Sequence, residues 1–155
     1  MRVGIGYDIH PLISGRRLVL GGVTIPFAMG LSGHSDADVV THAIMDALLG
    51  AAGYKDIGTQ FPSEDIKYKD ISSLILLDKV ESLIKAKGFQ INNIDATVVA
   101  EQPKIGPFID DMRLKLSQVL KINQDQIMVK ATTSEKLGFI GQGQGIAAYA
   151  IVSLL

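Results

Sequence analysis

The chain of 155 residues contains no cysteine. This absence excludes disulfide bonds, a thiolate nucleophile and every cysteine-based zinc site, and it is compatible with the cytoplasm. No apolar run reaches the about 20 residues that a membrane-spanning helix needs. The residues after Met1 alternate like a strand and lack the apolar run of a signal peptide. We therefore expect a cytoplasmic protein with no membrane partner.

A large excess of charge of either sign is also missing, because the formal net charge is -1. Such a balance gives no bulk attraction to nucleic acid or to an acidic membrane, so any anion site must be local. Hydrophobic residues make up 47% of the chain and charged residues 20%, which is typical of a globular protein. The sequence shows no repeat, linker or low-complexity tract, and we expect one domain over 1–155.

Hydrophobic patterns of both helical and alternating period run along the chain and predict helices and strands. The last strand is nearly all apolar and contains small residues, so we expect another element to cover it on each face, within a sheet or an oligomer. The predicted strands are 2–10, a hairpin over 16–26 that turns at Gly21 and Gly22, 94–101, 127–133 and 145–155; the predicted helices run from Ser35 to about 50–53, from 71 to 87, and from Pro107.

The stretch 34–42 opens the first predicted helix and is rich in polar groups. Ser35 is a good N-cap, and the helical period places Ser35, Asp38, His42 and Asp46 on one stripe. A histidine between two aspartates suits a metal ligand whose ring a second carboxylate orients, and a helix N-terminus suits a phosphate. The alternative is an ordinary capped helix with one polar histidine.

Asp8 and His10 are two residues apart in a predicted strand, so their side chains project from the same face. The chain has 3 histidines, and all of them lie in its first third. Together with His42, this pair would make a three-ligand site with one open position, as in a catalytic zinc centre. The alternative is two polar residues on a solvated face.

Two further segments, a loop and a strand end, carry polar residues that could bind a ligand. Residues 54–70 are irregular and mix acids, glycine, proline and aromatics, which is consistent with a binding loop or with a solvated connection. Residues 132–135 place three hydroxyls and the Glu135 carboxylate at a strand end. Such a cluster could hold a phosphate and its magnesium, or it could simply cap the next helix.

Together, these motifs resemble the 2-C-methyl-D-erythritol 2,4-cyclodiphosphate synthase family. The resemblance covers essentially the whole chain, with the motifs in the family's order and spacing, and they are far more specific together than singly. They are Gly4–His10, Gly33–Asp38 with His42, Asp56–Gly58, Phe61–Pro62, Glu101–Lys104 and Ala131–Phe139.

The resemblance implies an α/β (α+β) single domain with a mixed β-sheet and helices on one face of the sheet. It also implies a homotrimer whose sheets pack around a central axis, with active sites between neighbouring subunits. The implied substrate is 4-diphosphocytidyl-2-C-methyl-D-erythritol 2-phosphate, a cytidine diphosphate-linked molecule of the non-mevalonate isoprenoid route. Its 2-phosphate attacks the β-phosphate, which closes the cyclodiphosphate ring and releases CMP, so no side chain need be a nucleophile.

The resemblance also assigns residues to roles. Asp8, His10 and His42 would hold zinc, Glu135 would be the protein ligand of magnesium or manganese, and His34 and Thr133 would stabilise the transition state. The implied substrate contacts are Asp8, Ile9, His10, His34, Ser35, Asp56, Ile57, Gly58, Phe61, Pro62, Ser63, Glu64, Asp65, Ala100, Lys104, Ile105, Gly106, Ala131, Thr132, Thr133, Ser134, Glu135, Phe139 and Gln142.

Two departures from the family pattern concern the substrate and the trimer axis. Ser63 stands where the family often has an aspartate, which predicts a weaker or water-mediated polyol contact. Gln142 and Gln144 stand where the family often has an arginine and an acid, so we expect no firm binding of an isoprenoid diphosphate in an axial cavity. Two other functions fit the same residues: a zinc-dependent phosphohydrolase of a nucleoside diphosphate, and a trimeric nucleotide-binding module without turnover.

Overall fold

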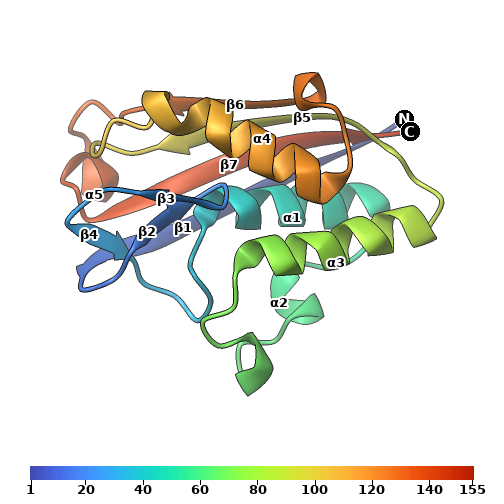
Figure 1. The fold of residues 1–155 in the computed structure, drawn as a ribbon, viewed down its shortest axis with the longest axis horizontal. Helices are drawn as coiled ribbons and strands as arrows, with labels where there is room; N and C mark the ends of the chain where they lie inside the picture. The colour runs from blue at the N-terminus through green and yellow to red at the C-terminus, as the bar shows by residue number, and fades with distance from the viewer.

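A five-stranded mixed sheet forms the body of the protein in the computed structural model, which describes residues 1–155 (Figure 1). The strand order is β4-β1-β7-β5-β6, and only the β5–β6 pair is parallel. The strands of this sheet are β1 (Arg2–Ser14), β4 (Met29–Leu31), β5 (Ile91–Val99), β6 (Ile127–Thr132) and β7 (Gly145–Leu154).

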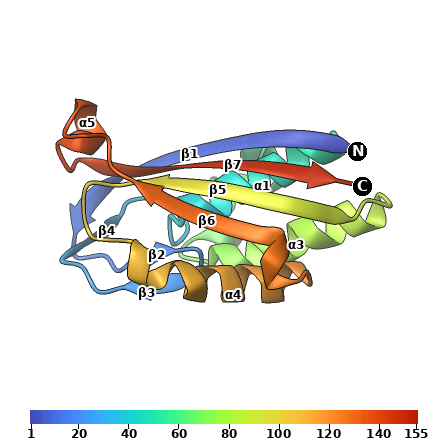
Figure 2. The ribbon, with the colours of Figure 1, turned by 90° about the horizontal axis from the view of Figure 1, so that it is seen from above.

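All three long helices lie on the same side of this sheet, as Figure 2 shows. The predicted mixed sheet with helices on one face is therefore confirmed. The long helices are α1 (Val39–Ala52), α3 (Ser73–Ala86) and α4 (Ile109–Leu120). The smaller elements are the hairpin β2 (Leu18–Leu20) and β3 (Val23–Ile25), the short helices α2 (Ile57–Gln60) and α5 (Gly138–Gly141), and the 3-10 turns η1 (Ile66–Tyr68), η2 (Gly106–Phe108) and η3 (Gln124–Gln126).

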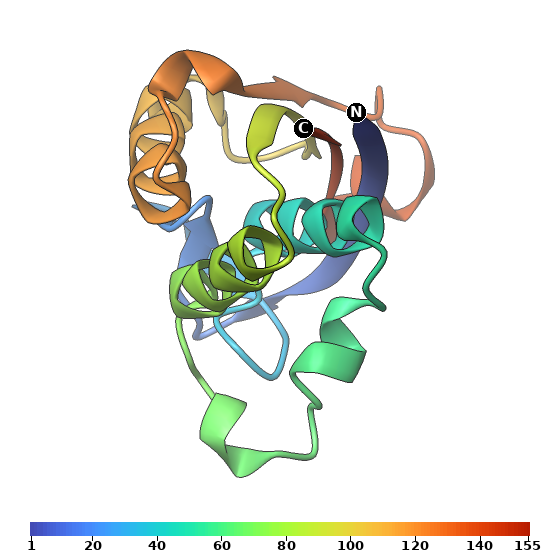
Figure 3. The ribbon, with the colours of Figure 1, turned by 90° about the vertical axis from the view of Figure 1, so that its right-hand side faces the viewer.

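Helix α1 runs through the middle of the molecule, between β1 and α3 (Figure 3). Its close approach to β1 depends on Gly4 and Gly6, because a side chain at either position would collide with the backbone oxygen of Ala47 or Ala43. All but two residues of α1 are buried, so the helix has no solvated stripe. This close packing places residues of β1 directly against the first turns of α1.

The opposite face of the sheet is apolar and exposed along β1 and β7 in the single chain. Val3, Ile5 and Tyr7 on β1 and Tyr149 and Ile151 on β7 are 44–71% exposed. The inward-facing residues of β7 are buried beneath the helices, as the small side chains predict. Within one chain β7 is thus covered on one face only, so the predicted cover on the other face is not present in the single chain.

The structure corrects the start of the first helix. The N-cap is Asp38 and not Ser35, since the Asp38 carboxylate accepts a hydrogen bond from the Thr41 N–H at 3.1 Å. The same carboxylate also accepts the N–H groups of Gly21 and Gly22 in the hairpin turn, at 2.8 and 2.7 Å. Asp38 therefore points away from His42, toward the hairpin, and the predicted polar stripe is wrong at that position.

The boundaries of other elements move by a few residues. Strand β1 continues past Pro11 to Ser14, because at Pro11 it leaves β7 and begins to pair with β4. The segment 54–70, predicted to be irregular, contains α2 and η1, and the short helix α5 was not predicted. No helix is both long and apolar enough to cross a membrane.

Candidate active site

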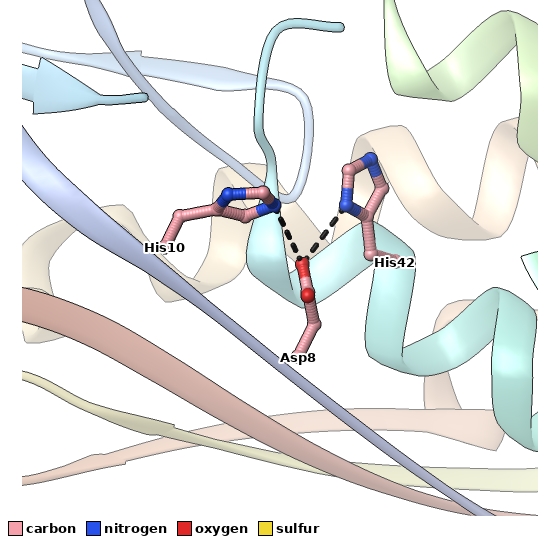
Figure 4. Close-up of side chains that lie close together, drawn as sticks. All are labelled: Asp8, His10 and His42. Atoms are coloured by element: carbon pink, nitrogen blue, oxygen red, sulfur yellow. Dashed lines mark hydrogen bonds and ion pairs between the residues drawn. The ribbon is translucent and has the colours of Figure 1, made fainter. Parts of the chain in front are cut away.

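Three of the predicted site residues meet where β1 crosses α1. Asp8 and His10 project from β1 on the face that packs against α1, and His42 lies in the first turns of α1. The Asp8 Oδ2 atom is 2.9 Å from His42 Nδ1 and 3.2 Å from His10 Nε2 (Figure 4). One ligand atom from each residue lies within 4.8 Å of the others. The strand and the helix thus place one carboxylate and two imidazoles around a common point.

The electrostatics of the three side chains are strongly coupled. Burial acts to raise the pKa of Asp8, but its hydrogen bonds to His10 and His42 outweigh burial and hold the pKa well below its usual value. Burial acts to lower the pKa of His42, but the hydrogen bond to Asp8 and the charge of Asp8 raise it. The site therefore keeps a carboxylate that is ionised throughout the physiological range.

This donor set fits a divalent transition metal. Zinc accepts imidazole nitrogen and carboxylate oxygen, and a catalytic zinc typically has three protein ligands and one open position. The Asp8 and His10 side chains are each 22% exposed, so a fourth ligand can approach from solvent. The structure confirms that Asp8, His10 and His42 are placed to bind a metal ion.

A pocket of about 470 Å³ opens beside the three side chains. The imidazole of His34 contributes a buried Nε2 atom that has no hydrogen-bond partner within the chain. A buried polar atom without a partner costs free energy, so this nitrogen has unused capacity for a hydrogen bond to a ligand or to water. The other predicted substrate contacts that line this pocket are Ser35, Ile57, Gly58, Phe61, Ser63 and Glu64.

Three predicted contacts in the same segment, Asp56, Pro62 and Asp65, do not line the pocket, and the two aspartates have local structural roles. The Asp56 carboxylate caps α2 by accepting the Thr59 N–H at 2.8 Å, and Asp65 caps η1 by accepting the Lys67 N–H at 3.1 Å. Helix α2 is tied to α1 by Asp46, whose Oδ1 accepts the Ile57 N–H at 2.8 Å. Asp46 thus holds one wall of the pocket.

A second cluster of predicted residues lies at the ends of β5 and β6. One oxygen of Glu101 accepts hydrogen bonds from the Ser134 N–H at 2.9 Å and the Lys136 N–H at 3.2 Å. The Thr133 hydroxyl donates to Glu135 Oε1 at 2.8 Å, and Thr133 and Glu135 are exposed. None of the predicted residues over 100–106 and 131–139 lines the pocket beside Asp8. A single chain therefore holds two separate halves of the predicted site.

The sequence did not predict the structural roles of three residues in the site region. Arg16 donates hydrogen bonds to the backbone oxygens of Gly33 and Ser35, at 2.9 and 2.6 Å, and so fixes the loop that carries His34. Ser73 and Asp36 lie behind the His42 ring. No local pattern marks them, because their partners lie on other segments of the chain.

The pattern of the YgbB family matches residues 1–155, which is the whole chain. The chain belongs to this family. A 2-C-methyl-D-erythritol 2,4-cyclodiphosphate synthase from Clostridium kluyveri is 60% identical over 154 residues, which cover 99% of this chain and 94% of that protein. The family resemblance seen in the sequence is thus confirmed.

Solved structures of YgbB relatives share the fold. IspF from Plasmodium falciparum, in a CDP complex, superposes with a TM-score of 0.88 at 39% identity, over 99% of this chain and 95% of that one. The bifunctional IspDF from Campylobacter jejuni superposes with a TM-score of 0.95 at 42% identity, over 99% of this chain and 42% of that longer one.

Proposed function

We propose that this YgbB-family protein converts 4-diphosphocytidyl-2-C-methyl-D-erythritol 2-phosphate into 2-C-methyl-D-erythritol 2,4-cyclodiphosphate and CMP, as a step of non-mevalonate isoprenoid synthesis. An oxygen of the 2-phosphate forms a bond to the β-phosphorus, and the bond from that phosphorus to the CMP oxygen breaks. The reaction makes the protein a phosphorus–oxygen lyase. The observation that carries the proposal is the convergence of Asp8, His10 and His42 in a full-length relative of such synthases.

Different side chains would bind the two cations and the substrate phosphates. Asp8, His10 and His42 would hold zinc, and Glu135 would hold magnesium or manganese beside the diphosphate. Bound there, the cations would supply Lewis-acid polarisation and neutralise phosphate charge. His34 lines the pocket and has an unpartnered Nε2, and Thr133 supplies a hydroxyl beside Glu135, so both suit contacts to charge that builds on the phosphates.

We assign the remaining predicted contacts to the two ends of the substrate. Residues 56–65, which include Pro62 and Asp65, would surround the methylerythritol part, with Ser63 as its weaker polyol contact. Ala100, Lys104, Ile105 and Gly106 would form the cytidine pocket. The list is completed by the phosphate contacts Ile9, Ser35, Ala131, Thr132 and Ser134, and by Phe139 and Gln142.

A homotrimer would join the two halves of the site. In one chain the pocket beside Asp8 and the cluster around Glu135 are separate, and the apolar face of β1 and β7 is uncovered. Three sheets packed on this face around a common axis would cover it and bring each pocket to a neighbour's cluster. Light scattering on the purified protein should then give three times the 16.6 kDa chain mass.

Some expectations stay predictions. Gln144 donates a hydrogen bond to Gln142 at 3.1 Å, and neither neutral amide offers a cation to an axial isoprenoid diphosphate. The cytoplasmic location expected from the sequence also stays a prediction.

Phosphorus NMR of the purified protein with magnesium and the diphosphocytidyl substrate tests the proposal. CMP together with a cyclic diphosphate would support it. CMP with a linear bisphosphate would identify a zinc-dependent phosphohydrolase instead, since metal-bound water would then be the attacking group. Binding of CMP without turnover would identify a nucleotide-binding module.

A further inference from the structure

The second ring nitrogen of His42 faces away from Asp8, into a buried set of hydroxyls. Its Nε2 atom lies 2.9 Å from the Ser73 hydroxyl and 3.2 Å from the Ser35 hydroxyl. Ser73 is 0% exposed, Ser35 is 7% exposed and His42 is 8% exposed. The set is largely buried, so most of its hydrogen bonds must run between groups of the protein itself.

The direction of these hydrogen bonds follows from counting protons. A serine hydroxyl has one proton to donate and two lone pairs to accept. Ser73 donates its proton to Asp36 Oδ1, while Asp36 Oδ2 accepts the Ser73 backbone N–H at 3.0 Å. An ionised carboxylate only accepts, so the Ser73 oxygen has no proton left for His42. The contact between Ser73 and His42 is therefore a hydrogen bond only if Nε2 carries the proton.

Ser35 is compatible with the same direction. Its oxygen already accepts the Ala37 N–H at 3.2 Å, and it has a second lone pair for the proton on Nε2. If Ser35 instead donated to Nε2, the lone pairs of Nε2 and of the Ser73 oxygen would face each other at 2.9 Å. That arrangement is repulsive in a buried site.

We propose that Asp36 and Ser73 are positioning residues that hold one proton of His42 on Nε2, so that a metal ion would displace the other proton, which Nδ1 donates to Asp8, and would bind at Nδ1. A neutral imidazole binds a metal through its unprotonated nitrogen, and the hydrogen bond at the other nitrogen selects which one that is. The inference rests on the metal site proposed above. In this account the carboxylate of Asp36 determines the metal-binding tautomer of His42. Asp36 acts through Ser73, and it lies on a different segment from all three ligands.

Nitrogen NMR of the zinc-loaded protein gives a direct readout of the tautomer. The protein is labelled with ¹⁵N-histidine, a His34→Ala variant assigns the His34 ring, and through-bond correlations to the assigned backbone distinguish His10 from His42. Long-range proton–nitrogen spectra distinguish a protonated from an unprotonated ring nitrogen. We expect His42 to carry its proton on Nε2, and a proton on Nδ1 in the zinc-loaded native protein would overturn the inference.

Zinc affinity, measured with Zn²⁺ against a chromogenic chelator, gives a second readout that does not depend on turnover. Loss of a partner behind a metal-binding histidine typically lowers metal affinity about 10-fold to 100-fold. We expect a loss in this range for Ser73→Ala. We expect a similar loss for Asp36→Asn, because the Ser73 N–H and hydroxyl use different oxygens of Asp36, and the amide replaces one of these acceptors with an N–H donor.

The neighbouring serine provides a matched control. Ser72 precedes α3 and makes no side-chain capping hydrogen bond, so Ser72→Ala should leave zinc affinity unchanged. Circular dichroism and thermal melting separate a local effect from loss of the α3 N-terminus, which Asp36 also holds. Native zinc affinity in a folded Ser73→Ala variant would overturn the role of Ser73. Failure of the native protein to bind zinc at all would instead overturn the proposed metal site.

Discussion

The two halves of the proposed site are held by the fold in different ways. The pocket beside Asp8 is fixed by long elements, since β1 packs on α1 through Gly4 and Gly6. The segment around Glu135 is exposed and its shape depends on a few polar contacts. The difference teaches that the chain places the side chains of its candidate metal site through its core, whereas the loop proposed to bind phosphate is positioned by individual hydrogen bonds.

The sharpest test of the half beside Asp8, called the rigid half because β1 and α1 fix it, is removal of a proposed metal ligand. His42→Ala should abolish zinc binding and lower turnover by more than the about 100-fold that loss of an outer partner costs. The fold should survive, because the change removes a ring whose partners are polar side chains and not core residues. Zinc content by elemental analysis and turnover by phosphorus NMR check this expectation.

The control for this experiment is the melting temperature with and without zinc. Zinc should raise the melting temperature of the native protein and leave that of His42→Ala unchanged, because a ligand stabilises only the state that binds it. Native zinc stoichiometry in the variant would contradict the assignment of His42 as a ligand.

A change at Glu135, in the exposed half, should affect turnover without affecting zinc binding by the half beside Asp8. Glu135→Gln removes one negative charge from the loop and keeps its size, so turnover should fall by about 10²-fold to 10³-fold while zinc content stays native. Turnover as a function of magnesium concentration measures the effect. Unchanged magnesium-dependent turnover would remove Glu135 from the mechanism.

The sequence predicted the chemistry of both halves but not the contacts that hold them. Asp8 and His10 follow from the two-residue period of a strand, and that pattern depends only on neighbouring residues. Asp36, Ser73 and Glu101 have partners that are 31 to 37 residues away, so no local pattern marks them.

The wrong N-cap of α1 has the same origin. Ser35 and Asp38 are both favourable N-cap residues, and local propensity does not separate them. The hairpin turn decides the start of the helix, because the N–H groups of Gly21 and Gly22 both bind the Asp38 carboxylate. A helical pattern depends on neighbouring residues only, so it cannot predict this long-range contact.

A smaller effect on turnover is expected from Glu101, whose carboxylate holds the loop around Glu135. Glu135 and Lys136 have φ angles of +53° and +63°, a left-handed conformation that is unfavourable for residues other than glycine. Glu101 binds the N–H groups on both sides of Glu135, so it offsets this strain. Glu101→Ala should lower turnover about 10-fold, below the 100-fold cost of a displacement of about 1 Å at a reacting group.

Two controls sharpen the result for Glu101. Glu101→Gln keeps an oxygen acceptor and should retain most of the turnover, and zinc content should be native in both variants. A variant Glu101→Ala with native turnover and a native magnesium dependence would show that the loop holds its shape without this carboxylate.

The smallest expected effect concerns the rigid half and its dependence on pH. Burial raises the pKa of Asp46 above its ordinary value of 3.8. The folded state therefore binds more protons than the unfolded state between pH 3.8 and the raised pKa, so this carboxyl makes stability fall as pH rises through that window.

Asp46→Asn keeps the Oδ1 acceptor for the Ile57 N–H but cannot ionise. The free energy of unfolding of the variant, relative to native, should therefore increase as pH rises through this window and stay constant above it. Denaturant titrations from pH 4 to pH 8 on both proteins measure the difference, with zinc content as the check that the site is intact. Parallel pH curves would show that the Asp46 carboxyl titrates alike in the folded and unfolded states, and that burial of this pocket wall leaves its proton affinity unchanged.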